Sequence, residues 1–283
     1  MEISEASYQI IAELLAARTG QQLTEGRRWR IGTSLSSIFR ERGITNVDQL
    51  VCLLTMPGET QLVQDVVEAL LNNETYFFRD KPTFDQLPAE IFPILAERRS
   101  AKRRLQIWCA GCSTGQEAHS LAIQFAEQAA QWEGWSIDIL GTDISQKAIS
   151  VARSGHYSQF EVQRGLSVSQ MLNYFDETAS GWQMHSSTRS IVRFQQHNIL
   201  DPAPCRQPFD LILCRNVLLY FDGPTRTQAF DRLHQALAPD GFLMLGAGET
   251  VVGQTQMFES AARRPSIYEP VSAMRSVQQA LAG

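Results

Sequence analysis

The chain has 283 residues, of which 43% are hydrophobic and 19% are charged, and its formal net charge is −5. This composition is ordinary for a globular protein, and the length allows one large domain and a small one. The acidic balance disfavours general nucleic-acid binding, which usually goes with a basic surface. The N-terminal stretch does not read as a signal peptide, and no apolar run approaches the ~20 residues that cross a bilayer. We therefore expect a cytoplasmic protein that neither binds nucleic acid nor inserts into a membrane.

Roughly the first 70 residues carry apolar side chains at helical spacing. Four helices are expected: residues 7–18, which Gly20 ends; a long helix from Thr24 to Gly43; a third that Asn46 caps and Pro57 ends; and residues 59–71. The pattern predicts a small helical bundle, and we assign residues 1–78 to this N-terminal domain.

Five arginines gather in the second predicted helix: Arg27, Arg28, Arg30, Arg40 and Arg42. A solvated helix face accounts for such a cluster, and a docking surface for an acidic partner is the alternative. Their spacing alone does not decide between the two.

Residues 72–100 contain Pro82, Pro88 and Pro93, and we expect this segment to join the bundle to the α/β unit. From Leu105 onward, strand and helix patterns alternate, which is typical of a doubly wound α/β domain. The expected strands are 105–109, 137–141, 191–194, 209–214, 242–245 and 266–269, and the expected helices are 115–130, 145–153 and 224–237. A polar, irregular stretch at about 157–193 predicts a small inserted subdomain. The last dozen residues are expected to be a frayed helix or a tail.

The stretch from Leu105 to Asp143 is the most informative part of the chain. It predicts a buried strand, a glycine turn from Gly111 to Gly115, a helix that opens at Gln116, and a second strand that ends in an acid. α/β proteins hold nucleosides with such a unit, in which the acid takes the ribose hydroxyls. The turn lacks the G-x-G-x-x-G pattern of dinucleotide binding.

Glu117 lies just inside the helix that follows the turn. The helix dipole favours a negative charge there by ~0.3–1 kcal/mol. Such a carboxylate repels a pyrophosphate and attracts a cation, such as the amino group or sulfonium of S-adenosylmethionine. An ordinary first-turn carboxylate explains Glu117 equally well.

Three further residues follow predicted strands. Asp143 is suited to the ribose hydroxyls or to capping the next helix. Ile144 is placed to pack on an adenine face. Asn198 is placed at an adenine edge, or it caps a turn before Asp201.

The five cysteines are Cys52, Cys109, Cys112, Cys205 and Cys214. Cys109 and Cys112 form a C-x-x-C pair with His119 nearby, which raises the possibility of a metal or redox site. The chain has no second such pair, and the first predicted strand buries Cys109. We therefore expect reduced thiols in a tight turn and no metal site.

The stretch from Arg215 to Phe221 follows the fourth predicted strand, so it faces the reacting centre. Methyltransferases that act on the amino group of adenine need an Asn/Asp-Pro-Pro-aromatic run here. That run is absent, and a nucleic-acid base is not the expected target.

Five segments carry a family resemblance: Asn73-Glu74-Thr75-Tyr76-Phe77-Phe78-Arg79, Ser113-Thr114-Gly115-Gln116-Glu117, Gly141-Thr142-Asp143-Ile144, Cys214-Arg215-Asn216-Val217 and Pro239-Asp240-Gly241. In this order they resemble the motifs of CheR-type chemotaxis receptor methyltransferases, over nearly the whole chain. The resemblance implies a class I (Rossmann-like) methyltransferase domain over residues 79–283. It also implies that S-adenosylmethionine methylates glutamate side chains on the methylation helices of chemoreceptors, with S-adenosylhomocysteine as the product.

The predicted cofactor-binding residues are Asn73, Thr75, Arg79, Gly111, Glu117, Asp143, Ile144, Asn198, Ile199, Asn216 and Val217. The resemblance also implies that Arg79 and Tyr220 border the transferring methyl group and that the arginine cluster docks the receptor. A glutamate carboxylate is already a nucleophile at neutral pH, so no general base is needed. We expect Arg79 to orient that carboxylate.

The chain departs from the family at one place. Members that bind a tethering pentapeptide of the receptor carry a glycine-rich loop in the inserted subdomain. The matching piece, residues 174–182, is short and has one glycine, so the chain resembles the pentapeptide-independent type. We expect a monomer.

The sequence disfavours two other functions. A non-catalytic regulator that binds S-adenosylmethionine or S-adenosylhomocysteine is disfavoured because Arg79, Asn216 and Tyr220 are all present. An NAD-linked oxidoreductase is disfavoured by Glu117 and by the missing G-x-G-x-x-G pattern.

Overall fold

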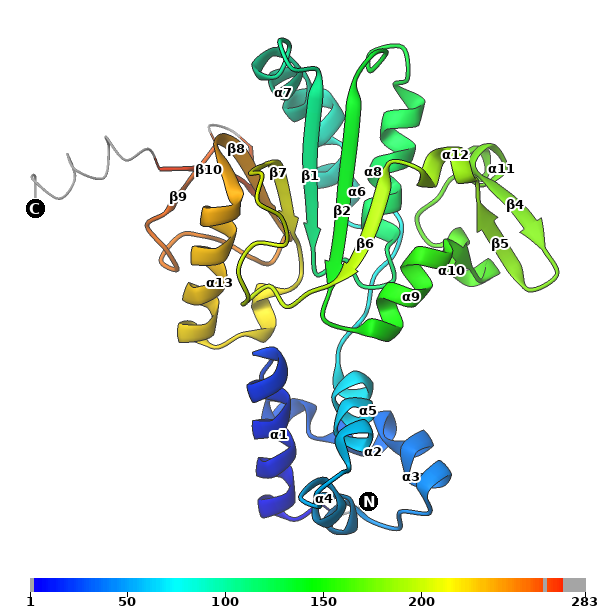
Figure 1. The fold of residues 1–283 in the computed structure, drawn as a ribbon, viewed down its shortest axis with the longest axis vertical. Helices are drawn as coiled ribbons and strands as arrows, with labels where there is room; N and C mark the ends of the chain where they lie inside the picture. The colour runs from blue at the N-terminus through cyan, green and yellow to red at the C-terminus, as the bar shows by residue number, and fades with distance from the viewer. Residues whose placement is uncertain (1–2, 262–263, 272–283) are drawn as a thin grey trace, which may run out of the picture. The chain divides into compact units, whose positions relative to one another are not determined.

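The computed structural model describes residues 3–261 and 264–271, which form two compact units (Figure 1). The helical unit runs to Asn72 and also contains Tyr220–Asp222. The sheet unit begins at Asn73 and holds the rest. The sheet unit thus includes residues 73–78, which differs from the predicted domain boundary after residue 78. The predicted C-terminal tail lies outside the described residues.

The helical unit contains α1 (Glu5–Thr19), η1 (Glu25–Arg27), α2 (Trp29–Ser34), α3 (Ser36–Arg42), α4 (Val47–Leu54) and α5 (Thr60–Leu70). Asn46 caps α4 as predicted, because its side chain accepts a hydrogen bond from the Gln49 amide. Gly20 and Gly43 end their helices in the left-handed conformation, with φ of 76° and 65°. These features confirm the small helical bundle.

The prediction of one long helix from Thr24 to Gly43 is wrong. Thr24 makes no side-chain cap, and Leu35, with φ −93° and ψ 1°, separates α2 from α3. Ile31, Leu35 and Ile38 are all buried. The apolar spacing therefore continues across the break and conceals it.

The segment over residues 72–100 contains helices that the sequence pattern did not predict. The segment forms α6 (Lys81–Phe84), η2 (Leu87–Ile91) and α7 (Phe92–Arg98). Its three prolines occupy the first turns of these helices, where the missing N–H leaves no helical hydrogen bond unmade. The helices pack on the sheet through five buried side chains: Phe84, Leu87, Ile91, Phe92 and Leu95.

In the described part of the chain, the main sheet has seven strands in the order β6-β2-β1-β7-β8-β10-β9. They are β1 (Arg104–Ala110), β2 (Ser136–Asp143), β6 (Val192–Gln196), β7 (Phe209–Cys214), β8 (Leu237–Leu245), β9 (Phe258–Ser260) and β10 (Ile267–Pro270). The first five in this spatial order pair in parallel, and β10 is antiparallel to both β8 and β9. All six predicted strands are confirmed. Only β9, a short edge strand, was not predicted.

Helices connect the parallel strands. They are α8 (Gln116–Glu127), which packs on β2 and β6, α9 (Gln146–Ser154), which does the same, and α13 (Gly223–Ala236), which packs on β8. The chain moves outward from β1 to β2 and β6, and then returns to the other side of β1 to form β7. The arrowheads of β1, β2 and β6 point to one edge of the sheet (Figure 1). This confirms the doubly wound α/β fold and places its topological switch point between β1 and β7, where such folds bind ligands.

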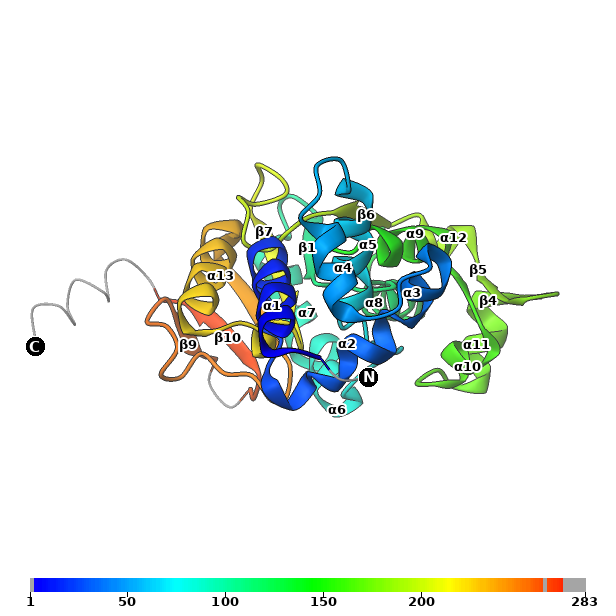
Figure 2. The ribbon, with the colours of Figure 1, turned by 90° about the horizontal axis from the view of Figure 1, so that it is seen from below.

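The inserted subdomain is confirmed as a second sheet with the order β3-β5-β4. It contains β3 (His156–Tyr157), α10 (Gln159–Gln163), α11 (Val168–Tyr174), β4 (Phe175–Thr178), β5 (Gly181–Met184) and α12 (Ser186–Arg189). Within the sheet unit it lies at the opposite end from β9 and β10 (Figures 1 and 2).

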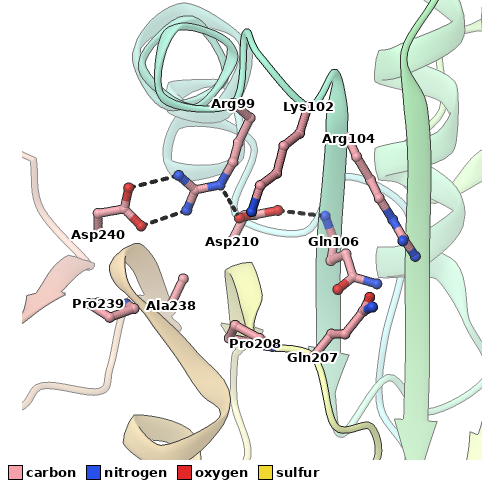
Figure 3. Close-up of a pocket in the computed structure, with 10 residues that line it drawn as sticks. All are labelled: Arg99, Lys102, Arg104, Gln106, Gln207, Pro208, Asp210, Ala238, Pro239 and Asp240. Atoms are coloured by element: carbon pink, nitrogen blue, oxygen red, sulfur yellow. Dashed lines mark hydrogen bonds and ion pairs between the residues drawn. The ribbon is translucent and has the colours of Figure 1, made fainter.

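An ion-pair network lies at the amino ends of β1 and β7 (Figure 3). Arg99 donates to both oxygens of Asp240, at 2.6 and 2.7 Å, and to Asp210 at 2.5 Å. A cavity of about 440 Å³ lies beside it. The lining contains none of the predicted cofactor residues. Among the described helices, none is both long enough and apolar enough to cross a bilayer.

Candidate cofactor-binding site

The carboxyl ends of four parallel strands carry the predicted cofactor residues. Gly111 follows β1, Asp143 ends β2, Asn198 follows β6 and Asn216 follows β7. Residues 73–79 belong to the same unit. All eleven predicted cofactor residues therefore lie in the sheet unit.

The glycine turn has a tightly constrained backbone. Gly111 has a φ of 76°, and its amide donates to the Thr142 carbonyl at 2.8 Å. A Cβ atom on Gly111 would lie 2.4 Å from Cγ2 of Val217, so a larger residue does not fit without movement. The turn is thus shaped to bring backbone and the Val217 side chain close together.

Asp143 anchors this turn to the end of β2. Its Oδ2 accepts from the Ser113 amide at 2.8 Å, and its Oδ1 accepts from the Ser145 amide at 2.9 Å. The residue is buried, with 8% exposure. Ser145, not Asp143, caps α9, because its hydroxyl accepts from the Ala148 amide. The capping alternative for Asp143 is therefore wrong.

Two serines bring Asn73 to Asp143. The Ser113 hydroxyl donates to the Asn73 carbonyl at 2.6 Å, and the Asn73 side-chain amide donates to the Ser145 hydroxyl at 3.5 Å. The segment before the sheet and the end of β2 thus form one polar cluster.

Glu117 is held by Arg215, a residue absent from the predicted set. The Arg215 Nη1 lies 3.0 Å from Glu117 Oε2, and its Nη2 lies 3.0 Å from Asp80 Oδ2 and donates to the Arg79 carbonyl at 2.7 Å. Burial raises the pKa of the Glu117 carboxyl, and the positive charges of Arg215 and Arg79 act in the opposite direction. Its position directly after a fully buried strand was the available sequence signal for Arg215.

Arg79 and Thr75 lie in the segment that leads to this cluster, and both are half-buried. The Arg79 guanidinium donates to the Glu74 carbonyl at 2.9 Å and lies 5.6 Å from the centre of the Tyr76 ring. Arg79 and Glu117 both contact Arg215, which donates to the Arg79 carbonyl and pairs with the Glu117 carboxylate.

Asn216 has a φ of 61°, in the left-handed region. Its Oδ1 atom is buried and has no hydrogen-bond partner within the described residues. A buried orphan acceptor favours a ligand that carries a donor. The amino group of S-adenosylmethionine is such a donor, so the residues present fit this cofactor.

Asn198, which follows β6, already makes hydrogen bonds within its own turn. Asn198 Oδ1 accepts from the Leu200 amide at 3.0 Å, and its carbonyl accepts from the Asp201 amide. This confirms that Asn198 caps a turn, which leaves its predicted adenine contact a prediction. Ile199 is buried, and Ile144 is half-buried.

The inserted subdomain contacts two segments that carry predicted cofactor residues, namely residues 73–79 and the glycine turn. Arg164 pairs with Glu74 at 2.5 Å, and a Cβ atom on Gly165 would lie 1.8 Å from the Phe77 carbonyl oxygen. The Tyr157 hydroxyl donates to the Thr114 carbonyl at 2.8 Å in the glycine turn and lies 2.7 Å from His119 Nδ1. Burial lowers the pKa of His119 from 6.5 to about 3, which keeps this imidazole neutral.

Tyr220 lies in the helical unit, where Asn72 donates to its hydroxyl and the Arg27 guanidinium lies 4.9 Å from its ring centre. Its place beside the methyl group stays a prediction. Three other arginines of the cluster have partners inside this unit: Arg28 pairs with Glu5 and Glu25, Arg30 donates to the Leu71 carbonyl, and Arg42 pairs with Glu59.

The C-x-x-C pair is fully buried and reduced. Burial raises the pKa of both Cys109 and Cys112 well above the usual range, so the thiolates that bind metals are costly here. The parts of the chain that the structure describes hold no group of three or more metal-binding side chains.

Comparisons with known proteins agree with this geometry. The family model described as CheR methyltransferase, SAM binding domain, matches residues 73–267. Chemotaxis protein methyltransferase Cher2 of Pseudomonas putida is 30% identical over 271 residues, which cover 94% of this chain and 98% of the relative. Chemotaxis protein methyltransferase 1 of Pseudomonas aeruginosa is 31% identical over 272 residues, with the same coverage. The chain therefore belongs to the CheR methyltransferase family and is a methyltransferase with S-adenosylmethionine as its cofactor.

Proposed function

We propose that the chain methylates glutamate side chains on the cytoplasmic methylation helices of chemoreceptors, as a monomer in the cytoplasm. The observation that carries this proposal is the extent of the similarity to chemotaxis methyltransferases. It covers 94% of the chain, so it includes the helical unit as well as the sheet unit. The products are a glutamate methyl ester and S-adenosylhomocysteine, and the ester serves sensory adaptation.

The carboxyl-end residues of the sheet unit would hold the cofactor. Asp143 is proposed to take the ribose hydroxyls, and Ile144, Asn198 and Ile199 to border the adenine. The orphan acceptor of Asn216 suits the amino group. When bound, the cofactor supplies a methyl group on a positively charged sulfur.

The incoming glutamate needs orientation more than it needs a base. Its carboxylate is ionised at neutral pH, so no side chain has to remove a proton. We assign the orienting role to Arg79, which is half-buried and keeps its guanidinium on a backbone carbonyl. Tyr220 is the proposed second residue beside the reacting carboxylate.

The arginine cluster is the proposed docking surface for the receptor. Arg40 is exposed, and Trp29, between Arg28 and Arg30 in the sequence, is 67% exposed. An exposed aromatic ring beside positive charges suits a helix that carries glutamates and an apolar face. The arginines with internal partners contribute less charge to this surface.

The inserted subdomain supports the pentapeptide-independent type. Its β4–β5 hairpin turns between Thr178 and Gly181 and has no long loop. We therefore expect a receptor C-terminal pentapeptide to bind weakly, and a titration that shows tight binding would overturn this assignment.

A transfer assay tests the proposal. Receptor-bearing membranes are incubated with the protein and with S-adenosylmethionine that carries a radiolabelled methyl group. Label on the receptor band is expected. Cofactor binding by calorimetry without any label transfer, over a panel of receptor fragments, would instead indicate a non-catalytic regulator.

A further inference from the structure

We propose that Glu249 is a positioning residue, which fixes the loop after β7 so that Asn216 and Val217 face the cofactor. This inference rests on the cofactor contacts assigned under the proposed function. Glu249 lies in the loop after β8, and no motif of the family resemblance includes it.

The carboxylate of Glu249 is surrounded by backbone N–H groups. Its Oε1 accepts from Val217 at 2.9 Å, Leu218 at 2.8 Å and Leu219 at 3.3 Å, and its Oε2 accepts from Asn216 at 2.7 Å and Gly246 at 2.9 Å. Four of these donors are consecutive along the chain. They converge on a single anion, which is the arrangement of a backbone nest.

These N–H groups need an acceptor because of where they lie. They precede and begin the short helix η3 (Leu218–Tyr220), whose first amides have no partner within the helix. A carboxylate satisfies several of them at once, and hydrogen bonds to a charged acceptor are the stronger kind. Asn216 also has a φ of 61°, in the left-handed region that most residues avoid but that asparagine tolerates.

Gly246 brings the two loops close enough for this contact. A Cβ atom there would lie 2.9 Å from both the Asn216 nitrogen and Glu249 Oε2. The loop after β8 and the loop after β7 are therefore locked together through one carboxylate.

The locked loop builds two walls of the cofactor site. Val217 packs against Gly111, where a Cβ atom would come within 2.4 Å of Cγ2. Asn216 contributes its buried Oδ1, which has no hydrogen-bond partner within the described residues. Because its own oxygens accept from five backbone amides, Glu249 acts through Asn216 and Val217 and does not itself bind the cofactor.

The test uses Glu249→Gln in the full chain. The amide keeps the shape but replaces one acceptor oxygen with an NH2 group that faces N–H donors. The dissociation constant for S-adenosylhomocysteine, measured by calorimetry, is expected to rise about tenfold or more. Amide hydrogen exchange at residues 216–219 is expected to accelerate in the ligand-free protein. In the methyl-transfer assay, KM for S-adenosylmethionine should rise more than kcat falls.

Glu269→Gln is the matched control, because Glu269 is half-buried in the same unit and pairs with Arg98 at 3.3 Å. It should leave binding and exchange at residues 216–219 unchanged. If Glu249→Gln does not fold, Gly246→Ala displaces the carboxylate and is expected to have the same effects. The proposal also requires that the amides of residues 216–219 exchange slowly in the wild-type protein.

Unchanged binding by Glu249→Gln, even with faster exchange, would overturn the positioning role. Fast exchange of these amides in the wild type would overturn it as well. Binding and exchange do not involve a receptor. A wild-type protein that binds S-adenosylhomocysteine but methylates no receptor would therefore refute the proposed function and leave this test valid.

Discussion

The guanidinium of Arg215 lies 3.0 Å from the carboxylate of Glu117, and the two side chains are only 1% and 13% exposed. The same guanidinium bonds to Asp80 and to the Arg79 carbonyl. One buried cation thus ties the end of β7 to the start of α8 and to the segment that carries Arg79. Breaking a buried pair is costly because it leaves a charge without a partner.

Arg215→Met is expected to destabilise the protein by about 3–5 kcal/mol, since it leaves Glu117 unpaired in a buried place. Urea unfolding measures this loss. Arg193→Met is the control, because Arg193 pairs with Asp138 at 2.9 Å but is 61% exposed. Its expected cost is below ~1 kcal/mol. Equal losses of unfolding free energy for the two variants would contradict the stabilising role of the buried Arg215 ion pairs.

Gly165→Ala tests the brace between the inserted subdomain and the cofactor segment. Gly165 has a φ of 104°, and an added Cβ atom would lie 1.8 Å from the Phe77 carbonyl oxygen. The expected destabilisation is about 2–5 kcal/mol, from strain plus displacement of the backbone. Binding of S-adenosylhomocysteine should weaken too, because residues 73–79 move with Phe77.

Gly223→Ala is a control with neither a left-handed φ nor a steric conflict, because a Cβ atom there meets nothing within 4 Å. Its effect on urea unfolding should stay within about 0.5 kcal/mol. A Gly165→Ala protein that binds S-adenosylhomocysteine as tightly as the wild type would refute a link between the subdomain and the cofactor site.

His119 is expected to make the fold sensitive to acid. Burial lowers its pKa from 6.5 to about 3, so the unfolded chain takes up this proton before the folded chain does. The stabilisation is complete above pH 6.5 and is lost as the pH falls below that value. From about pH 7.5 to about pH 5, wild type should lose ~2 kcal/mol more unfolding free energy than His119→Phe. Identical pH dependence in the two proteins would contradict a buried neutral imidazole.

Arg40→Glu tests the docking surface. Charge reversal on an exposed docking face should raise KM for a receptor fragment roughly three- to tenfold and leave KM for S-adenosylmethionine unchanged. The effect should shrink at high salt. Lys102→Glu is the control, because Lys102 is a basic residue beside the cavity at the amino ends of the strands. A similar change in both variants would indicate a general charge effect and no docking face.

The fold was predictable where burial dictates the sequence pattern. The strand Phe209–Cys214 has the predicted bounds, because all its residues are buried and all except Asp210 are apolar. Gly20, Gly43 and Asn46 marked helix ends through local chemistry that the sequence displays directly. The α6–α7 helices were missed because prolines in a sequence often mark loops, whereas here they lie in the first turns of helices.

Part of the candidate site was predictable from the order of strands and loops. Gly111, Asp143 and Asn216 follow strands, so the topology alone brings them to one edge of the sheet. Arg215 and Glu249 were missed because their roles depend on partners far away in the sequence. Arg215 reaches back to Asp80 and Glu117, and Glu249 reaches to the loop after β7. Spacing within a motif does not reveal such pairs.

The most direct test of the proposed chemistry is the nature of the bond that carries the transferred methyl group. Receptor fragments labelled by the wild-type protein are digested and mapped by mass spectrometry, and the label is then treated with mild base. Methylation at a glutamate and release of the label as methanol are predicted, because a carboxyl ester hydrolyses in base. Base-stable label, or label on lysine, arginine or another side chain, would contradict glutamate O-methylation.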